Sequence, residues 1–288
     1  MVRRTLGTIA VLLVLAAGAR GQMMEDYLDI GVMKVRPEKR TEFESIIKKL
    51  VDANRRHNGD AWVALDTIFG EQYTIYLIST RTSHGAIDTG YEMFMSAMNK
   101  GLGQAASTKL LQDFNTTVSG VRGELRRRRW DLSANPPADA AAMGRRLGEA
   151  RWIRTTRVHV RPGRQLQFEA QLKTIKEAAE KGNTNYPSLV SQTIAGQKGS
   201  VFYISWLVKS LADFDSIPTL QQLLGEDGFR SLQSQAADNV ETAETIIARI
   251  VPELSNPPAA VAAVAPDFWN PKPPPAAKPK AKVEAANP

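Results

Sequence analysis

The chain of 288 residues contains no cysteine, which excludes disulfide bonds, thiolate catalysis and cysteine-bound metals. It contains only three histidines, and they are scattered along the sequence. A metal site formed by several histidines is therefore not expected. Phosphate-binding loops and the G-x-S-x-G and H-E-x-x-H motifs are also missing. The sequence thus lacks the usual signatures of several large enzyme classes.

Long apolar runs are scarce, and the longest one lies at the amino terminus. Arg3 and Arg4 precede an apolar stretch over residues 5–16, and Ala17-Gly18-Ala19 follow it. A run of this length is shorter than the roughly 20 residues that a membrane-spanning helix needs. Positive charge, a short apolar run and small residues are the pattern of a secretory signal peptide. We expect residues 1–21 to be a signal peptide. The protein should then be periplasmic or secreted, and it should contain no transmembrane segment after cleavage.

The carboxyl-terminal residues 259–288 are rich in proline, alanine and lysine. Such a composition buries little apolar surface and is typical of a disordered segment. Phe268 and Trp269 are the only aromatic side chains in this tail, and they could dock on the body. The lysines could contact an anionic surface or a protein partner. We predict a disordered tail over 259–288.

The central part of the sequence contains an internal repeat. At an offset of 125 residues, 35–54 and 160–179 share seven identities, whereas average composition predicts about one by chance. The matches include Val35-Arg36-Pro37 with Val160-Arg161-Pro162. Further matches follow in the same order up to a Leu-Ser motif near the end of each copy. An ordered series of matches over the full unit indicates a duplication.

Both copies predict the same order of elements. A β-rich segment ends at a proline, a helix follows, then a hairpin around glycine, a long helical stretch broken by glycine, and a closing strand. The closing strands are expected at 123–132 and 245–254. The order β-α-β-β-α-β is that of the ferredoxin-like unit. The predicted fold class is therefore α+β, with tandem ferredoxin-like repeats at 22–137 and 152–258 joined by a linker at 138–151.

The tandem βαββαβ units, each about 110 residues long, resemble the dimeric α+β barrel superfamily, which includes antibiotic-biosynthesis monooxygenase-like domains. The resemblance rests on topology and on the V-R-P motifs at Val35 and Val160, each of which is followed by a Phe-Glu pair, at Phe43 and at Phe168. It implies that the two sheets close one pseudo-dimeric α+β barrel. The superfamily contains cofactor-free oxygenases, haem enzymes and small-molecule binders, so the resemblance implies no particular reaction.

Alternation along the first strands separates two faces. Met33 and Val158 are apolar at matching positions, as are Val35 and Val160, so this face is expected to pack against helices. The opposite face would then carry polar residues into the barrel. The candidate ligand-binding residues are Lys34, Arg157, His159, Arg127, Arg249, Tyr76 and Tyr203.

Charged side chains inside a barrel favour an anionic or carbonyl-bearing small molecule, because buried charges need a partner. Arg157 would lower the pKa of His159 by repulsion between like charges, if both line the cavity. The alternative is that Arg157 and His159 lie at a wet strand end and serve only the structure. No cofactor and no metal are predicted, although haem held by one histidine stays an open alternative.

The run Arg126-Arg127-Arg128-Arg129 before Trp130 allows two interpretations. It could bind anions or nucleic acid, or it could protect the exposed side of a strand. The second copy has no such run, and export removes most nucleic-acid partners, so no nucleic acid is expected. Two functions remain open: small-molecule binding in or beside the barrel, and a cofactor-independent monooxygenase-like reaction on an aromatic or quinone-like substrate.

Overall fold

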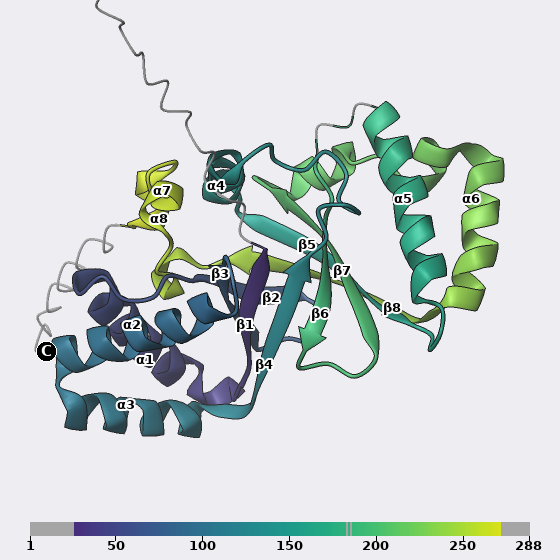
Figure 1. Cartoon of the computed structure of the whole chain (residues 1–288). Helices are drawn as coiled ribbons and strands as arrows, with labels where there is room; N and C mark the ends of the chain where they lie inside the picture. The colour runs from purple at the N-terminus through teal and green to yellow at the C-terminus, as the bar shows by residue number, and fades with distance from the viewer. Residues whose placement is uncertain (1–25, 183, 185, 272–288) are drawn as a thin grey trace, which may run out of the picture.

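The computed structural model describes residues 26–182, 184 and 186–271 (Figure 1). The predicted signal peptide and residues 272–288 of the predicted tail lie outside this part. The strands are β1 (Tyr27–Val35), β2 (Val63–Phe69), β3 (Thr74–Arg81), β4 (Val118–Arg128), β5 (Trp152–Val160), β6 (Leu189–Ala195), β7 (Ser200–Val208) and β8 (Val240–Ile250).

The helices differ widely in length. The α-helices are α1 (Arg40–Arg56), α2 (Gly85–Leu102), α3 (Gln104–Thr117), α4 (Ala140–Glu149), α5 (Gln165–Lys181), α6 (Leu220–Asn239), α7 (Ala259–Ala262) and α8 (Pro266–Trp269). Short 3-10 helices are η1 (Pro37–Lys39), η2 (Leu211–Ser216) and η3 (Pro252–Leu254). None of the helices in the described ranges is long and apolar enough to cross a membrane.

The strands form one closed antiparallel barrel in the order β1-β3-β2-β8-β5-β7-β6-β4, with β4 returning to β1. The first half contributes β4-β1-β3-β2 and the second half contributes β8-β5-β7-β6. The pairs β2–β8 and β4–β6 join the two halves. The barrel predicted from the sequence is therefore present, with the same pairing order in each half.

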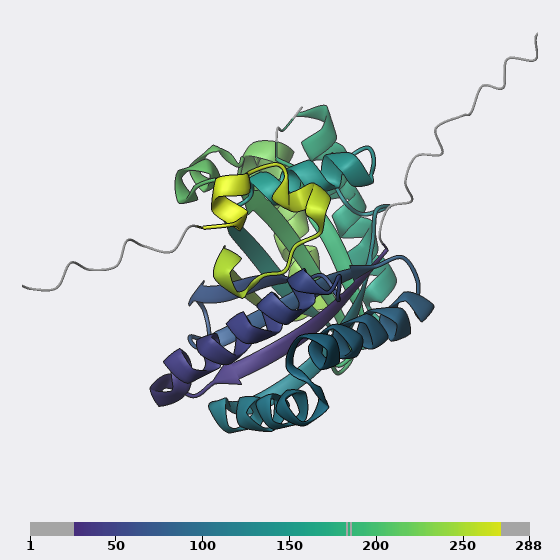
Figure 2. The same cartoon turned by 90° about the vertical axis from the view of Figure 1, so that its left-hand side faces the viewer.

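Helices cover the outside of the barrel on two opposite sides. Helices α1, α2 and α3 lie against the first half, and α5 and α6 lie against the second (Figures 1 and 2). Met33 and Val35 pack into one core cluster with Phe43 of α1. Val158 and Val160 pack into another with residues of α5. The predicted helix-facing side of β1 and β5 is confirmed.

Glycines interrupt both long helical stretches, as predicted. Gly103 has a φ of 82° between α2 and α3, and Gly225 has a φ of 70° inside α6. Glycine adopts positive φ without the steric penalty that other residues carry. The closing strands begin earlier than predicted, at Val118 and Val240, because they pair with the whole length of β1 and β5.

The segments predicted as a linker and as the start of a tail differ from expectation. The segment 138–151 contains α4, whose Asp139 side chain accepts a hydrogen bond from the Ala142 backbone N–H. Residues 259–271 form α7 and α8 and are not an extended chain. A third core cluster joins α4, α7 and α8 to inward-facing strand residues at one end of the barrel. These three short helices therefore close that end (Figure 1).

Candidate functional site: a cavity inside the barrel

The barrel interior contains a cavity of about 490 Å³. At the end covered by α4 the cavity has an apolar base, which we call the floor. The floor consists of Val63, Leu65, Met143, Leu147, Ile153, Leu189, Leu207 and Ala248. These strand residues point inward because side chains alternate across a strand, and α4 adds its residues at positions i and i+4. The floor excludes water and offers space for an apolar group.

Charged side chains surround the opposite end, which we call the mouth. The mouth consists of Lys34, Glu71, Arg122, Arg157 and Glu244. Lys34 pairs with Glu71, and Arg157 pairs with Glu244. The Arg157 side chain is 34% exposed and that of Glu244 is 45% exposed, so this pair is in contact with solvent. The cavity therefore opens at the end where β1 and β5 finish.

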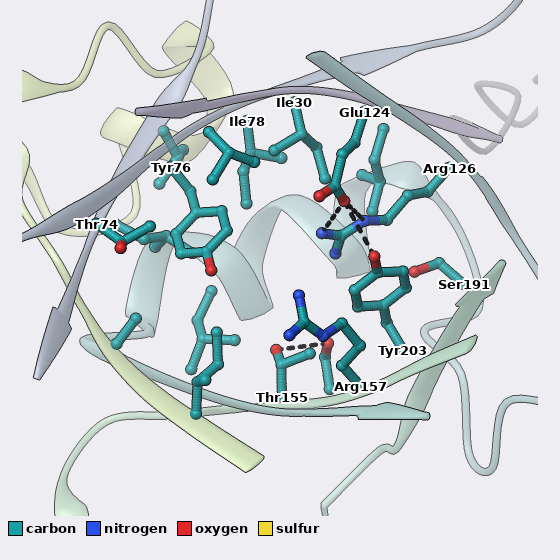
Figure 3. Close-up of a pocket in the computed structure, with 18 of the residues that line it drawn as sticks. Ile30, Thr74, Tyr76, Ile78, Glu124, Arg126, Thr155, Arg157, Ser191 and Tyr203 are labelled. Carbon is teal, nitrogen blue, oxygen red and sulfur yellow. Dashed lines mark hydrogen bonds and ion pairs between the residues drawn. The ribbon is translucent and has the colours of Figure 1, made fainter. Parts of the chain in front are cut away.

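Glu124 of β4 is the most deeply buried charged group of the cavity, with a side chain only 1% exposed. One carboxylate oxygen accepts hydrogen bonds from Arg126 Nη2 at 2.6 Å and Tyr203 OH at 3.1 Å. The other accepts from Arg122 Nη2 at 2.6 Å and Gln197 Nε2 at 2.7 Å. Figure 3 shows Glu124, Arg126 and Tyr203 grouped on one wall. The acceptor capacity of this carboxylate is therefore fully used.

The ionisation of Glu124 is set by two opposing effects. Burial alone would raise its pKa, but the charge of Arg126 and the hydrogen bonds from Arg126, Arg122 and Gln197 lower the pKa to about 2. Glu124 is consequently an anion at every physiological pH. A carboxylate of this kind organises its neighbours and is a poor general base.

Tyr203 of β7 completes this polar wall. The guanidinium carbon of Arg126 lies 3.3 Å from the centroid of the Tyr203 ring, which is a cation–π contact. Burial raises the pKa of Tyr203, so its hydroxyl stays protonated and donates to Glu124. The arginine, the carboxylate and the phenol therefore hold each other in place.

Tyr76 of β3 lies on the other side of the cavity. Figure 3 shows its hydroxyl directed into the open space and toward Arg157. The hydroxyl has no hydrogen-bond partner among residues 26–182, 184 and 186–271. Burial raises the pKa of Tyr76 and outweighs the opposing charge of Arg126. Tyr76 is therefore a neutral donor that is available to a bound molecule.

The structure brings together four of the residues predicted from the sequence. Lys34, Arg157, Tyr76 and Tyr203 line the cavity. His159 does not line it, although it follows Arg157 on the same face of β5. His159 lies two residues closer to the end of β5 than Arg157, where it pairs with Thr242 of β8 and Val201 of β7.

Arg127 and Arg249 were assigned to the wrong face of the closing strands. Both are exposed, because the inward-facing residues of β4 and β8 are the even-numbered ones, such as Arg126 and Ala248. A shift of one residue moves a side chain to the other face of a strand. The residues missed in this way are Arg122, Glu124 and Arg126. Their spacing of two residues is the pattern that could have identified them.

A second, smaller cavity of about 270 Å³ lies outside the barrel, between β1 and β3 and helices α1 to α3. Arg81 forms its polar end and binds both carboxylate oxygens of Asp60 at 2.6 Å. Arg81 also contacts Asp29 at 3.2 Å. Since apolar side chains form most of the remaining wall, this cavity lacks the cluster of donors found inside the barrel.

No protein-family profile matches the chain, and no curated protein matches it. Solved structures do resemble it. An anthrone oxidase-like protein superposes with a TM-score of 0.50 and 11% identity, over 80% of this chain and 93% of the other. A candidate monooxygenase from Lactobacillus acidophilus NCFM has a TM-score of 0.48 and 9% identity, over 81% of this chain and 98% of the other. A heme-binding protein from Thermus thermophilus has a TM-score of 0.45 and 10% identity, over 81% of this chain and 94% of the other.

These likenesses concern the path of the chain, since the identities are far too low to transfer residue roles. The closed antiparallel barrel and the superposition on the anthrone oxidase-like protein together identify the architecture. The chain has the fold of the dimeric α+β barrel proteins.

Proposed function

We propose that this protein binds a small organic molecule inside the barrel. The observation that supports this most directly is the cavity of about 490 Å³, with an apolar floor and a polar wall. Ligand pockets commonly measure about 300–1,000 Å³ and combine an apolar lining with a few convergent polar groups. The ligand would place its apolar body on the floor and its polar group near the middle of the barrel.

The charges of the cavity favour an anionic or strongly polarised ligand. Its lining contains the cations Lys34, Arg122, Arg126, Arg128 and Arg157. It contains the anions Glu71, Glu124 and Glu244. This excess of positive charge attracts a carboxylate, phenolate or carbonyl oxygen more than a cation. An apolar monoanion therefore fits both the shape and the charge.

The experiment uses 2-naphthoate, which joins an apolar ring system to one carboxylate. We expect it to bind the mature protein and to shift the NMR signals of floor methyl groups such as those of Leu65 and Leu207. The cavity-filling variant Thr155→Phe replaces a lining side chain with a larger one and should weaken 2-naphthoate binding by about tenfold or more. Unchanged affinity in Thr155→Phe, with shifts confined to the outer surface, would contradict binding inside the barrel.

A cofactor-independent monooxygenase-like enzyme is the second candidate, and the anthrone oxidase-like protein of the same fold makes anthrone a suitable test substrate. Such a reaction begins with removal of a proton from the substrate, for which a base with a pKa near the working pH is required. Glu124 cannot supply it, since its pKa is about 2. Oxygen uptake with anthrone, abolished in Tyr76→Phe, would favour the enzyme over the binding protein.

Haem is the cofactor that the heme-binding protein of similar fold suggests. Its iron needs an axial ligand, which is usually histidine, cysteine, methionine or tyrosine. No histidine lines either cavity in the described part of the chain. Burial raises the pKa of Tyr76 and Tyr203, which opposes a phenolate ligand. Methionine usually ligates haem together with a histidine, and the cavity that contains Met143 is lined by no histidine of the described residues. The donors of the barrel cavity therefore do not fit haem.

We further propose that the protein is exported. The supporting observation is the signal-peptide pattern of residues 1–21. Expressed in a bacterial host with its own amino terminus, the protein should be recovered outside the cytoplasm. Mass spectrometry should place its first residue between 20 and 22. The variant Ala19→Arg should accumulate unprocessed, and a full-length wild-type chain in the cytoplasm would contradict export.

The two halves of the barrel are best explained by duplication of one ferredoxin-like unit. Besides the sequence matches and the shared pairing order, two serines have equivalent contacts. Ser133 Oγ accepts from the Val190 backbone N–H at 2.9 Å, at the start of β6. Ser255 Oγ accepts from the Ala64 backbone N–H at 2.9 Å, at the start of β2. A duplicated unit would conserve such a contact in both copies.

A further inference from the structure

The polar groups of the cavity are concentrated on one side, although the strands pair in the same order in both halves. Glu124 and Arg126 of β4 point inward, whereas β8 places Ile246 and Ala248 on the corresponding lining. On β5 Arg157 points inward at the mouth, while β1 has Val32 at the equivalent position. The barrel therefore has one polar wall and one apolar wall. This asymmetry favours a single orientation of a bound ligand.

Most donors of the polar wall are already used. Arg126 gives two hydrogen bonds to Glu124 and stacks on Tyr203, and Arg122 also binds Glu124. The hydroxyl of Tyr203 donates to Glu124 as well. A ligand that competed for these donors would leave the buried Glu124 carboxylate unpaired, which is costly. The Glu124 group is therefore a fixed part of the wall.

Two donors differ from this fixed group. Among the described residues, the Tyr76 hydroxyl has no partner, and Arg157 is held only by Glu244 at the solvent-exposed mouth. Figure 3 shows the Tyr76 hydroxyl and the Arg157 guanidinium approaching the same open space from opposite sides. A surface ion pair contributes at most about 1 kcal/mol, so an incoming anion can replace Glu244 as the partner of Arg157.

We propose that Tyr76 and Arg157 together form the head-group site for a carboxylate or other oxyanion, with Glu244 as the group that the ligand displaces. This inference rests on the proposed binding function and adds the ligand class and its orientation. The anionic head lies between Tyr76 and Arg157, and the apolar body extends to the floor. Arg157 supplies charge and a planar pair of donors, and Tyr76 supplies one neutral donor.

The test compares two probes of nearly the same shape, the anion 2-naphthoate and the neutral 2-naphthalenemethanol. Isothermal titration calorimetry measures both with the full mature protein and with Tyr76→Phe and Arg157→Gln. Each substitution should weaken 2-naphthoate binding about tenfold, because a hydrogen bond to a charged group is lost. Binding of 2-naphthalenemethanol should change much less in Arg157→Gln. The variant Glu244→Gln should bind 2-naphthoate more tightly than the wild type, since the competing carboxylate is gone.

The possible outcomes separate this inference from the proposed function. If the wild-type protein binds neither probe, both the proposed function and the head-group site are wrong. If the wild-type protein binds 2-naphthoate and both variants bind it equally well, only the head-group site is wrong. Folding of each variant is checked by its circular dichroism spectrum, and both substitutions are mild because the Tyr76 hydroxyl is unpaired among the described residues and the Arg157 pair is exposed.

Discussion

Replacing Glu124 with glutamine is expected to lower the free energy of unfolding at pH 7 by about 3 kcal/mol, at the lower end of the range for breaking a buried ion pair. The glutamine keeps the shape of the side chain but removes its charge. Arg126, whose side chain is only 10% exposed, would then be a buried cation without its carboxylate. The remaining amide oxygen could accept from only some of the four groups that now bind Glu124.

The same substitution should change how stability depends on pH. The pKa of Glu124 is lowered in the folded protein from 4.5 to about 2. The ionised group thus stabilises the fold fully above pH 4.5, and this contribution is lost as the pH falls toward 2. A difference of this size corresponds to about 3 kcal/mol, at 1.36 kcal/mol for each pKa unit. The wild-type protein should therefore lose more stability between pH 5 and pH 2.5 than Glu124→Gln does.

Urea unfolding followed by tryptophan fluorescence measures both effects. The matched control is Glu244→Gln, which removes a carboxylate from the same cavity but from an exposed ion pair. That control should change the free energy of unfolding by less than about 1 kcal/mol. Equal losses in the two variants at pH 7, or a parallel decline of Glu124→Gln and wild type in acid, would show that Glu124 is not the organising charge.

The faces of β1 and β5 could be predicted because apolar residues occupy matching positions in both copies. Met33 with Val158 and Val35 with Val160 leave only one choice of helix-facing side. Lys34, between Met33 and Val35, and Arg157, directly before Val158, are then assigned inward by alternation alone. A repeated pattern carries this information because each copy confirms the other.

The inward-facing side of the closing strands β4 and β8 could not be predicted in the same way. At the end of β4 and directly after it, residues 126–129 are all arginine, so alternation gives no preference for either face. In β8, Ile246 and Ile247 are both apolar and lie on opposite faces, which removes the signal again. The inward-facing side is set by pairing with β1 and β5, where Glu124 lies opposite Ile30 and Glu244 lies opposite Arg157. Such pairing is a property of the closed barrel and not of the local sequence.

The helices α4, α7 and α8, which close one end of the barrel, were not predicted for a different reason. Met143 and Leu147 of α4 are four residues apart and face the cavity, and Trp269 of α8 packs in the same cluster. Each segment is short and rich in alanine, so neither would be stable as an isolated helix. They fold because they pack against each other and against the inward-facing strand residues. Composition alone suggested a linker and a tail.

Replacing Trp269 with alanine is expected to cost about 3–5 kcal/mol of stability, the usual range for removing a fully buried large aromatic side chain. Trp269 is 0% exposed, and its indole Nε1 donates to the Gly148 carbonyl oxygen at 3.0 Å. Gly148 is the position where α4 meets the segment after α7, since a Cβ there would lie 2.6 Å from the Val264 Cβ. The indole thus joins the carboxyl-terminal helices to α4.

Thermal unfolding followed by circular dichroism tests this contact. A loss of 3–5 kcal/mol corresponds to a fall in the unfolding midpoint of roughly 10 °C for a domain of this size. The control is Asp267→Ala, which lies on the same short helix but is exposed and should change the midpoint little. Because α4 forms part of the floor, Trp269→Ala should also weaken 2-naphthoate binding at temperatures where the barrel is still folded. A Trp269→Ala midpoint within about 2 °C of the Asp267→Ala control, which is a difference of less than 1 kcal/mol, would mean that the barrel is closed by α4 alone.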